Sequence, residues 1–263
     1  MKNILVTGAA GGMGKAKCTL LSQKGYNVYG IDYREIESDA NFTFMVCDVT
    51  KTQSVEKVKD FIKDSAGKLD AVVHTAGVYD LDSLVEISEE RFCRVFDINL
   101  FGVYRINKAF VPLMKDGGRI IITSSELAPL DPLPFTGIYG ISKAALEKYA
   151  FSLRMEVNLL GLSVSVIRPG AVKTGLLNVS TVALDRFCEN TKLYNTNAKK
   201  FHQIVDSVES KNVSPEVIAE TVLAALCDKR PKYVYNVNRN PLLKLLNALP
   251  DRAQVNIIKG ILK

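Results

Sequence analysis

Short runs of β-branched and aromatic residues alternate with longer amphipathic segments, and this alternation restricts the fold more than any other feature of the sequence. The predicted strands span residues 3–6, 27–31, 42–47, 71–74, 119–123, 163–167 and 233–237. Strands separated by helices form βαβ units, in which the strands run parallel and helices cover both faces of the sheet. The sequence therefore predicts the doubly wound α/β class, with a sheet of about seven strands.

The chain of 263 residues shows no internal repeat and no linker, so we predict one domain over residues 1–263. The predicted helices span residues 14–24, 54–65, 89–114, 139–160 and 215–227. Two regions depart from the alternation. Residues 175–212 lack a strand and are predicted to form a substrate flap, and residues 241–263 form an amphipathic extension. A packed terminal helix pair is favoured for the extension over a membrane or partner surface.

Composition excludes several classes of protein. The five cysteines are scattered and never form a C-x-x-C pair, which indicates free thiols in a reducing compartment, and no metal site is expected. The start of the chain lacks the features of a secretory signal, so we expect a cytoplasmic protein. Residues 211–263 hold nine Lys and Arg against four Asp and Glu. The short charge run at residues 229–232 has no interleaved aromatic residue, so nucleic-acid binding is not expected.

A glycine-rich loop lies between the first predicted strand and the first predicted helix. Gly8, Gly12, Met13 and Gly14 lie in the segment Thr-Gly-Ala-Ala-Gly-Gly-Met-Gly. Such glycines allow a tight turn and let backbone amides approach a pyrophosphate at the helix N-terminus. This loop therefore predicts a dinucleotide site.

The second predicted strand ends in an acidic residue, Asp32, 18 residues after the last glycine. A carboxylate at about this distance typically binds a ribose 2′-hydroxyl and would repel a 2′-phosphate. Asp32 therefore favours NAD over NADP. Arg34 instead favours NADP, since its guanidinium could bind the 2′-phosphate if the Asp32 side chain turned aside.

Tyr139 and Lys143 are four residues apart at the predicted start of a helix, so both side chains reach one site. A nearby cation favours the phenolate and lowers the pKa of a tyrosine. The pair could therefore carry a proton near neutral pH. The same spacing also occurs by chance on solvated helices, and the interpretation depends on the rest of the chain.

Several motifs occur in one order and together resemble the short-chain dehydrogenase/reductase family, a Rossmann-type fold. They are T-G-x-x-x-G-x-G, Asp48-Val49, Thr75-Ala76-Gly77, Asn99, Ser124-Ser125, Y-x-x-x-K at 139–143, and Pro169-Gly170 with Thr174. The resemblance covers residues 3 to 174 and includes the strand near Tyr233. Several motifs in register are far more specific than any one of them.

The resemblance implies the roles of individual residues. Tyr139 would be the acid/base, Lys143 would lower its pKa and hold the nicotinamide ribose, Ser125 would bind the substrate oxygen, and Asn99 would hold a water in the proton relay. The cofactor would contact the glycine loop and Asp32, Asp48, Val49, Ala76, Gly77, Val172 and Thr174. The resemblance also implies a homodimer or homotetramer built on the helices that hold Asn99 and Tyr139.

Three features depart from the family pattern. Thr75 stands where the family usually has asparagine, which alters a bond that steadies the fourth strand. The family interval between serine and tyrosine is commonly 13 residues, whereas Ser125 and Ser124 lie 14 and 15 residues before Tyr139. We choose Ser125, because the Pro-rich segment that follows can absorb one residue. Glu126 occupies the usual interval, but its carboxylate would place a negative charge at the substrate oxygen.

We therefore predict an NAD(H)-dependent oxidoreductase that interconverts a secondary alcohol and a ketone. The apolar flap and extension favour a bulky hydrophobic substrate. The segments 130–135 and 249–252 resemble hydroxysteroid and retinol dehydrogenases, so hydroxysteroids or bile acids come first and long-chain lipid carbonyls second. The alternatives are a sugar-nucleotide enzyme of the extended group, which has different glycine spacing, and a non-catalytic NAD-binding sensor or scaffold. His74 is interpreted as a buried structural residue rather than a catalytic one.

Overall fold

A computed structural model describes residues 2–36, 41–208 and 212–263, and for residues 175–180 and 206–208 it describes the backbone alone. Seven parallel strands form one sheet, as the sequence predicts, and their order in the sheet is β3-β2-β1-β4-β5-β6-β7. The strands are β1 Asn3–Thr7, β2 Asn27–Asp32, β3 Thr43–Val46, β4 Leu69–His74, β5 Met114–Thr123, β6 Ser163–Pro169 and β7 Val234–Val237. The order reverses between β1 and β4, and ligands of open α/β sheets bind at the carboxyl ends of the strands beside such a reversal.

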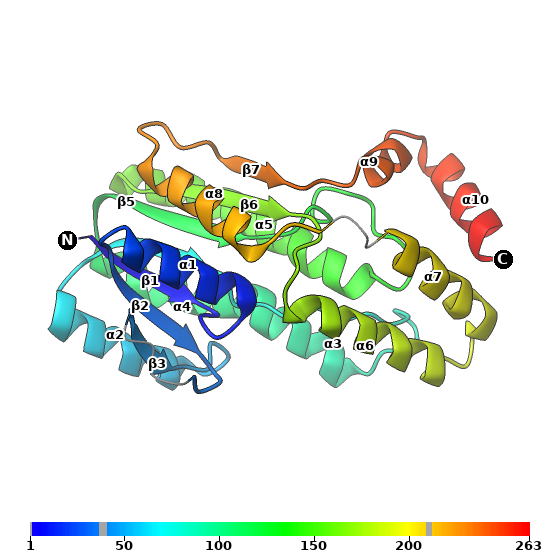
Figure 1. Ribbon diagram of the computed structural model, residues 1–263, viewed down its shortest axis with the longest axis horizontal. Coiled ribbons are helices and arrows are strands. Elements are labelled where there is room, and N and C mark those ends of the chain that lie inside the picture. Colours follow the sequence, from blue (N-terminus) through cyan, green and yellow to red (C-terminus); the bar gives the residue numbers. More distant parts are fainter. Residues whose placement is uncertain (1, 37–40, 209–211) are drawn as a thin grey trace.

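Helices cover both faces of the sheet (Figure 1). α1 (Gly12–Gln23) and α8 (Pro215–Cys227) lie together on one face, and α2 (Thr52–Ala66), α4 (Gly102–Phe110) and α5 (Gly137–Val157) lie on the other. Each face has its own apolar cluster of buried side chains. Because the strands are buried on both faces, they carry nearly continuous apolar runs such as that of residues 71–73.

The prediction of one continuous helix over residues 89–114 is wrong. The chain forms α3 (Glu89–Phe96), one π-helical turn η1 (Asp97–Phe101), α4, and a 3₁₀ turn η2 (Val111–Leu113), after which β5 begins. The amphipathic pattern continues across the π turn, so it does not reveal the break. A π turn holds one extra residue, and such turns often lie at functional sites.

Four helices lie beyond the carboxyl ends of the strands (Figure 1). α6 (Gly175–Asn190) and α7 (Asn195–Val208) occupy most of the predicted flap, and α9 (Pro241–Asn247) and α10 (Asp251–Leu262) occupy the extension. A third apolar cluster joins α6, α7 and α10 to the loop after β4. It comprises Leu81, Phe135, Ala183, Leu184, Phe187, Ala198, Phe201 and Leu262. The side chains of Leu176, Leu177 and Val179, which contributed to the flap prediction, lie outside the described residues.

Ion pairs hold the flap helices to the loop after β4. Asp80 accepts hydrogen bonds from Arg91 at the start of α3 and from Arg186 of α6. Glu86 accepts from the Thr191 hydroxyl at 2.7 Å and from two backbone amides of the turn between α6 and α7. These contacts hold α6 and the turn after it against the loop that follows β4.

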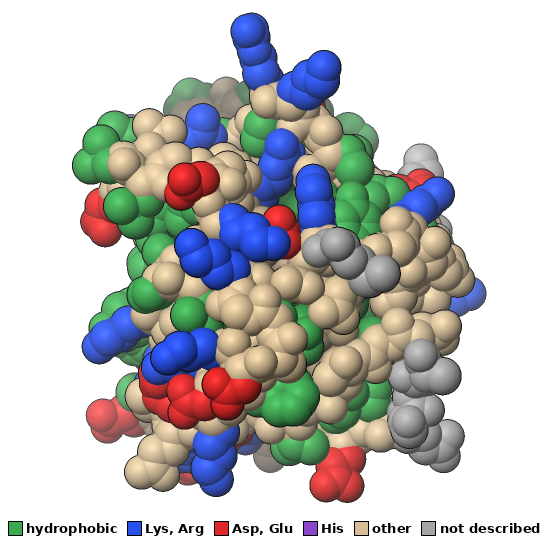
Figure 2. Space-filling view, turned by 90° about the vertical axis from the view of Figure 1, so that its left-hand side faces the viewer, with side chains coloured by type: hydrophobic (Ala, Val, Ile, Leu, Met, Phe, Trp, Pro, Cys, Tyr) green, Lys and Arg blue, Asp and Glu red, His purple; other side chains and the backbone are tan. Residues whose placement is uncertain are grey.

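At the amino ends of the strands, the surface carries both basic and acidic side chains (Figure 2). Figure 2 shows this face, where Lys and Arg side chains are interspersed with acidic ones, and Lys115 forms one such pair with Asp70 at 3.0 Å. In the described part of the chain, every helix falls short of the length and apolarity that spanning a membrane requires.

Candidate active site

The glycine loop is built for close backbone approach. Gly8 adopts a left-handed φ of +73°, and a β-carbon there would lie 2.6 Å from the Ala76 amide nitrogen. A β-carbon on Gly14 would lie 1.9 Å from the Gly8 carbonyl oxygen, and one on Gly12 would lie 3.0 Å from the Thr174 methyl. The loop therefore contacts the ends of β4 and β6, as a cradle for a pyrophosphate requires, and the chain fits a dinucleotide.

Asp32 lies at the end of β2 with its carboxylate directed at the glycine loop. One carboxylate oxygen accepts from the Ala10 amide at 3.1 Å, and the other accepts from the Arg34 amide at 3.1 Å and its Nε at 3.3 Å. Asp32 is buried, whereas half of the Arg34 side chain is exposed. Arg34 is therefore held by Asp32 rather than standing in its place.

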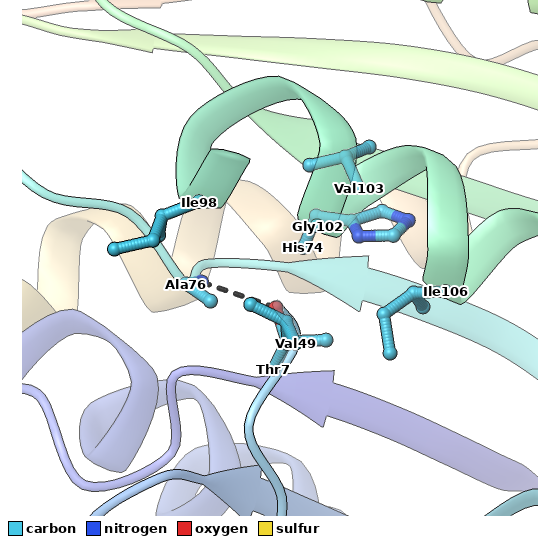
Figure 3. A pocket seen from close by; sticks show the side chains of 8 residues that line it. All are labelled: Thr7, Val49, His74, Ala76, Ile98, Gly102, Val103 and Ile106. Atoms are coloured by element: carbon cyan, nitrogen blue, oxygen red, sulfur yellow. Dashed lines mark hydrogen bonds between the residues drawn. The ribbon is translucent and has the colours of Figure 1, made fainter. Parts of the chain in front are cut away.

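A narrow cavity lies between β1, β4 and α4, beside residues that are predicted to contact the cofactor (Figure 3). Val49 and Ala76 line it, and the Thr7 hydroxyl accepts from the Ala76 amide at 3.1 Å. Asp48 accepts from the Thr50 amide and hydroxyl at 2.9 and 2.7 Å, so its carboxylate shapes the turn into α2. The cavity is too narrow for a water molecule, so the side chains that line it form part of the packing beneath the site.

His74 lines this cavity (Figure 3) and also takes part in a buried network of hydrogen bonds. Its Nε2 bonds to the Asn107 Oδ1 at 2.9 Å, and the Asn107 amide donates to the Tyr149 hydroxyl at 3.2 Å. Burial lowers the pKa of His74 to about 4. The ring is therefore neutral at physiological pH and joins β4, α4 and α5.

Tyr139 and Ser125 meet at the carboxyl end of β5. The Ser125 hydroxyl lies near that of Tyr139 and opposes the rise in its pKa, whereas the buried Ser124 Oγ has no hydrogen-bond partner among the described residues. The extra residue before Tyr139 is accommodated by a turn that ends at Phe135, whose φ is +66°. This value is rare for a bulky residue. The turn therefore aligns Ser125 with Tyr139 despite the longer interval.

Lys143 lies beside Tyr139, with its Nζ 5.7 Å from the Tyr139 ring centre. It donates to the Thr123 carbonyl at 3.3 Å. Burial lowers the pKa of Lys143 to about 8, opposed by Glu147, and raises the pKa of Tyr139 to about 12, opposed by Ser125. The lowered tyrosine pKa expected from the sequence is therefore not found in the protein alone, because desolvation by burial is the largest influence on it.

Asn99 occupies the π turn and is fully buried. Its Oδ1 accepts from the Val78 amide at 2.8 Å, and its Nδ2 donates to the Val78 carbonyl and to Ser142 Oγ, both at 3.0 Å. A β-carbon on Gly77 would lie 3.2 Å from Asn99 Oδ1 and 3.5 Å from Lys143 Nζ. Asn99 therefore joins the loop after β4 to the helix that carries Tyr139 and Lys143.

Glu126 points away from Tyr139. Its carboxylate accepts from the Asn240 amide at 2.6 Å, and a β-carbon on Gly170 would lie 2.9 Å from Oε1. Burial raises the pKa of Glu126, opposed by that bond and by Arg239. Glu126 therefore connects the serine loop to the start of α9.

Aromatic side chains enclose the tyrosine on the flap side. The rings of Tyr79 and Tyr139 lie 4.8 Å apart, and Phe135 contacts Phe187 at 4.5 Å and Tyr194 at 5.3 Å between ring centres. Val172 is buried where the chain leaves β6, and it bridges to Val213. Tyr139 thus packs against Tyr79, which in turn packs against the third apolar cluster.

Comparison with known proteins agrees with this arrangement. The sequence profile of the short chain dehydrogenases matches residues 2–183. The chain belongs to the short chain dehydrogenase family. It is 28% identical over 254 residues to the 3-ketodihydrosphingosine reductase of Bacteroides thetaiotaomicron, covering 94% of this chain and 93% of that protein. It is 30% identical over 191 residues to mouse estradiol 17-beta-dehydrogenase 2, covering 66% of this chain and 49% of that protein.

The crystal structure of a short chain dehydrogenase family protein from Francisella tularensis has the same fold. It matches 90% of this chain and 96% of its own with a TM-score of 0.74 and 28% identity. As a member of the short chain dehydrogenases, the chain is an oxidoreductase that acts on an alcohol or ketone with NAD or NADP. The hydroxysteroid and retinol branch suggested by the sequence is not established by these relatives, whose names differ in substrate.

Sequence reasoning missed one polar residue of this dehydrogenase site, Lys17 in α1. It is fully buried beneath the ends of β4 and β5. A signal was present, because Gly14, Lys17, Cys18 and Leu21 fall on one face of the predicted helix, and all four are buried. A lysine on the apolar face of a helix was the available sign of a buried charge.

Proposed function

We propose that this protein is an NAD(H)-dependent enzyme that interconverts a secondary alcohol and a ketone on a bulky hydrophobic molecule. The observation that carries the proposal is the placement of Ser125 beside Tyr139, with Lys143 buried next to the pair. The three side chains lie at the same sheet edge as the glycine loop. A single site thus holds a proton donor, a second hydroxyl and a cation.

The residues would divide the reaction as follows. The nicotinamide cofactor supplies or accepts the hydride. During ketone reduction negative charge develops on the substrate oxygen, where the Ser125 hydroxyl would donate a hydrogen bond and Tyr139 would give up its proton. During alcohol oxidation the Tyr139 oxygen would receive the proton. Lys143 and the positive charge of an oxidised nicotinamide would favour the phenolate that burial disfavours.

NAD(H) is proposed as the preferred cofactor because Asp32 is buried, directed at the glycine loop and holds Arg34. Asn99 is proposed to position the loop and helix of the site. Asp48, Val49, Ala76, Gly77, Val172 and Thr174 are proposed to contact the cofactor. A homodimer or homotetramer is proposed from the family resemblance and from the exposed apolar side chains of α4 and α5.

Hydroxysteroids or bile acids are proposed as the substrate, on the basis of the apolar third cluster beside Tyr139. A long-chain lipid ketone is the second candidate, favoured by the Bacteroides reductase that matches nearly the whole chain. A panel of steroid, long-chain keto-lipid and small sugar ketones, assayed by NADH oxidation, separates these classes. Preferential turnover of the sugars would contradict both candidates.

The variant Tyr139→Phe tests the catalytic assignment. We expect it to retain NADH binding, measured by fluorescence titration, and to lose turnover by at least about 100-fold, because it cannot transfer a proton. Tyr149→Phe is the matched control, since this tyrosine lies on the same helix and bonds to Asn107 instead. Unchanged turnover in Tyr139→Phe would show that the protein uses a different acid.

A further inference from the structure

Lys17 is a buried charge that the proposed reaction does not use. It lies on α1, its side chain is fully buried, and burial lowers its pKa to about 7. Burying an ammonium costs free energy unless its donors are paired. A residue of this kind is retained in a fold only where its contacts compensate for that cost.

The contacts join two neighbouring strands. Lys17 Nζ donates to Thr75 Oγ1, directly after β4, and to Thr123 Oγ1, the last residue of β5, both at 2.8 Å. Thr75 stands where the family usually has asparagine, and its hydroxyl serves as one half of this bridge. The ammonium therefore holds the two strand ends at a fixed separation.

Thr123 is shared by two ammonium groups from opposite faces of the sheet. Lys17 reaches its hydroxyl from α1, and Lys143 reaches its carbonyl oxygen from α5 at 3.3 Å. Ser125 follows two residues later. A shift of Thr123 would consequently move both the acceptor of Lys143 and the loop that carries Ser125.

Few charges surround Lys17. The titratable groups that act on it are the Cys18 thiol on its own helix and the Lys143 ammonium on α5. His74, on the neighbouring strand β4, is held neutral by burial. Since the two ammonium groups repel each other, Lys17 is the one that loses its proton first, at about pH 7 against about pH 8 for Lys143.

We propose that Lys17 is a positioning residue, whose bridge between Thr75 and Thr123 places Lys143 and Ser125 for the proton transfer. This inference rests on the proposed function. The bridge can nevertheless be tested without measuring turnover, because Lys17 can be substituted while Ser125, Tyr139 and Lys143 are kept.

The experiment compares Lys17→Met, which fills the same space without charge, with Lys15→Met, an exposed lysine on the same helix. We expect Lys17→Met to lower kcat about 10-fold or more while changing the KM for NADH by less than about 3-fold. An inflection of the wild-type pH profile near pH 7 should also disappear. Both effects should be absent in Lys15→Met.

A second pair of variants covers the case in which Lys17→Met does not fold. Thr75→Ser keeps the hydroxyl and should retain activity, whereas Thr75→Val removes it and should reproduce the loss. If Lys17→Met keeps kcat within about twofold from pH 6 to 9, or if Thr75→Val acts like Thr75→Ser, the inference is wrong.

Two measurements are independent of turnover. Backbone amide NMR signals of Thr123 and Ser125 should move in Lys17→Met and stay in place in Lys15→Met. Wild type should also gain stability relative to Lys17→Met as the pH rises from about 7 to 10, because the unfolded chain binds the Lys17 proton over that range and the folded chain does not. If the wild-type protein reduces no ketone but the NMR and stability changes occur as expected, the proposed function is contradicted. The positioning role of Lys17 is then still supported.

Discussion

At the scale of single residues, burial moves the ionisable groups of this site toward their neutral forms. It lowers the pKa of Lys17 to about 7 and of Lys143 to about 8, and it raises that of Tyr139 to about 12. Near neutral pH the protein alone thus keeps the phenol protonated and ready to donate.

The cofactor preference can be tested at two neighbouring residues. Asp32→Asn removes the charge but keeps the shape, and we expect it to weaken NADH binding about 10-fold and to strengthen NADPH binding, because repulsion of a 2′-phosphate is lost. Arg34→Ala should leave NADH binding within about threefold. Fluorescence titration with both cofactors measures this, and a wild type that prefers NADPH would overturn the assignment.

Residues that carry chemistry could be found in the sequence because their types and order are specific. Tyr139, Lys143 and Ser125 were predicted together, and the structure brings them together. The pKa of Tyr139 and the pairing of Lys17 could not be predicted. Both depend on which side chains are desolvated and on contacts between residues more than 50 positions apart.

At the scale of elements, the sheet and its covering helices follow from the alternation of apolar runs, and the seven strands were predicted within a few residues of their observed bounds, except β5, which starts at Met114. The π turn around Asn99 was not predicted, because a single extra residue leaves the amphipathic pattern of the sequence almost unchanged. The turn before α5 was only partly foreseen. Its proline content suggested room for one residue, but the left-handed conformation of Phe135 depends on the aromatic cluster around it.

The close packing of the glycine loop can be tested by comparing Gly14, in the first turn of α1, with Gly260 in α10. Gly14→Ala would place a β-carbon 1.9 Å from the Gly8 carbonyl oxygen, so we expect a loss of about 3 kcal/mol or more in unfolding free energy and loss of NADH binding. Gly260→Ala in α10 meets no atom within 4 Å and should gain up to about 1 kcal/mol. Urea unfolding measures both. Equal effects of the two substitutions would show that the loop can open.

At the scale of the whole molecule, the side of the sheet that holds α4 and α5 exposes several large apolar side chains. They include Phe101, Tyr104, Phe151, Met155 and Leu159. α4 and α5 lie side by side, since Asn107 bonds to Tyr149 across them. Exposed apolar surfaces of this kind are typical of protein interfaces, and this one is the surface through which the proposed homo-oligomer would form.

Charge placed on that surface should separate the copies. We expect the double variant Phe151→Asp/Met155→Asp to shift the protein from an oligomer to a monomer in light scattering after size-exclusion chromatography, because two carboxylates cannot be buried unpaired. Leu193→Asp, an equally exposed leucine between α6 and α7, is the control. A wild-type protein that is already monomeric at micromolar concentration would refute the proposal.

The strand order also determines when the sheet can be completed during synthesis. β1 pairs with β2, which follows within about 20 residues, but its other edge pairs with β4 at residues 71–73. A nascent chain therefore carries an open, apolar strand edge until β4 has left the ribosome, and long-range parallel pairing is slow. Synthesis halted between β3 and β4 should leave the most aggregation-prone form of this protein.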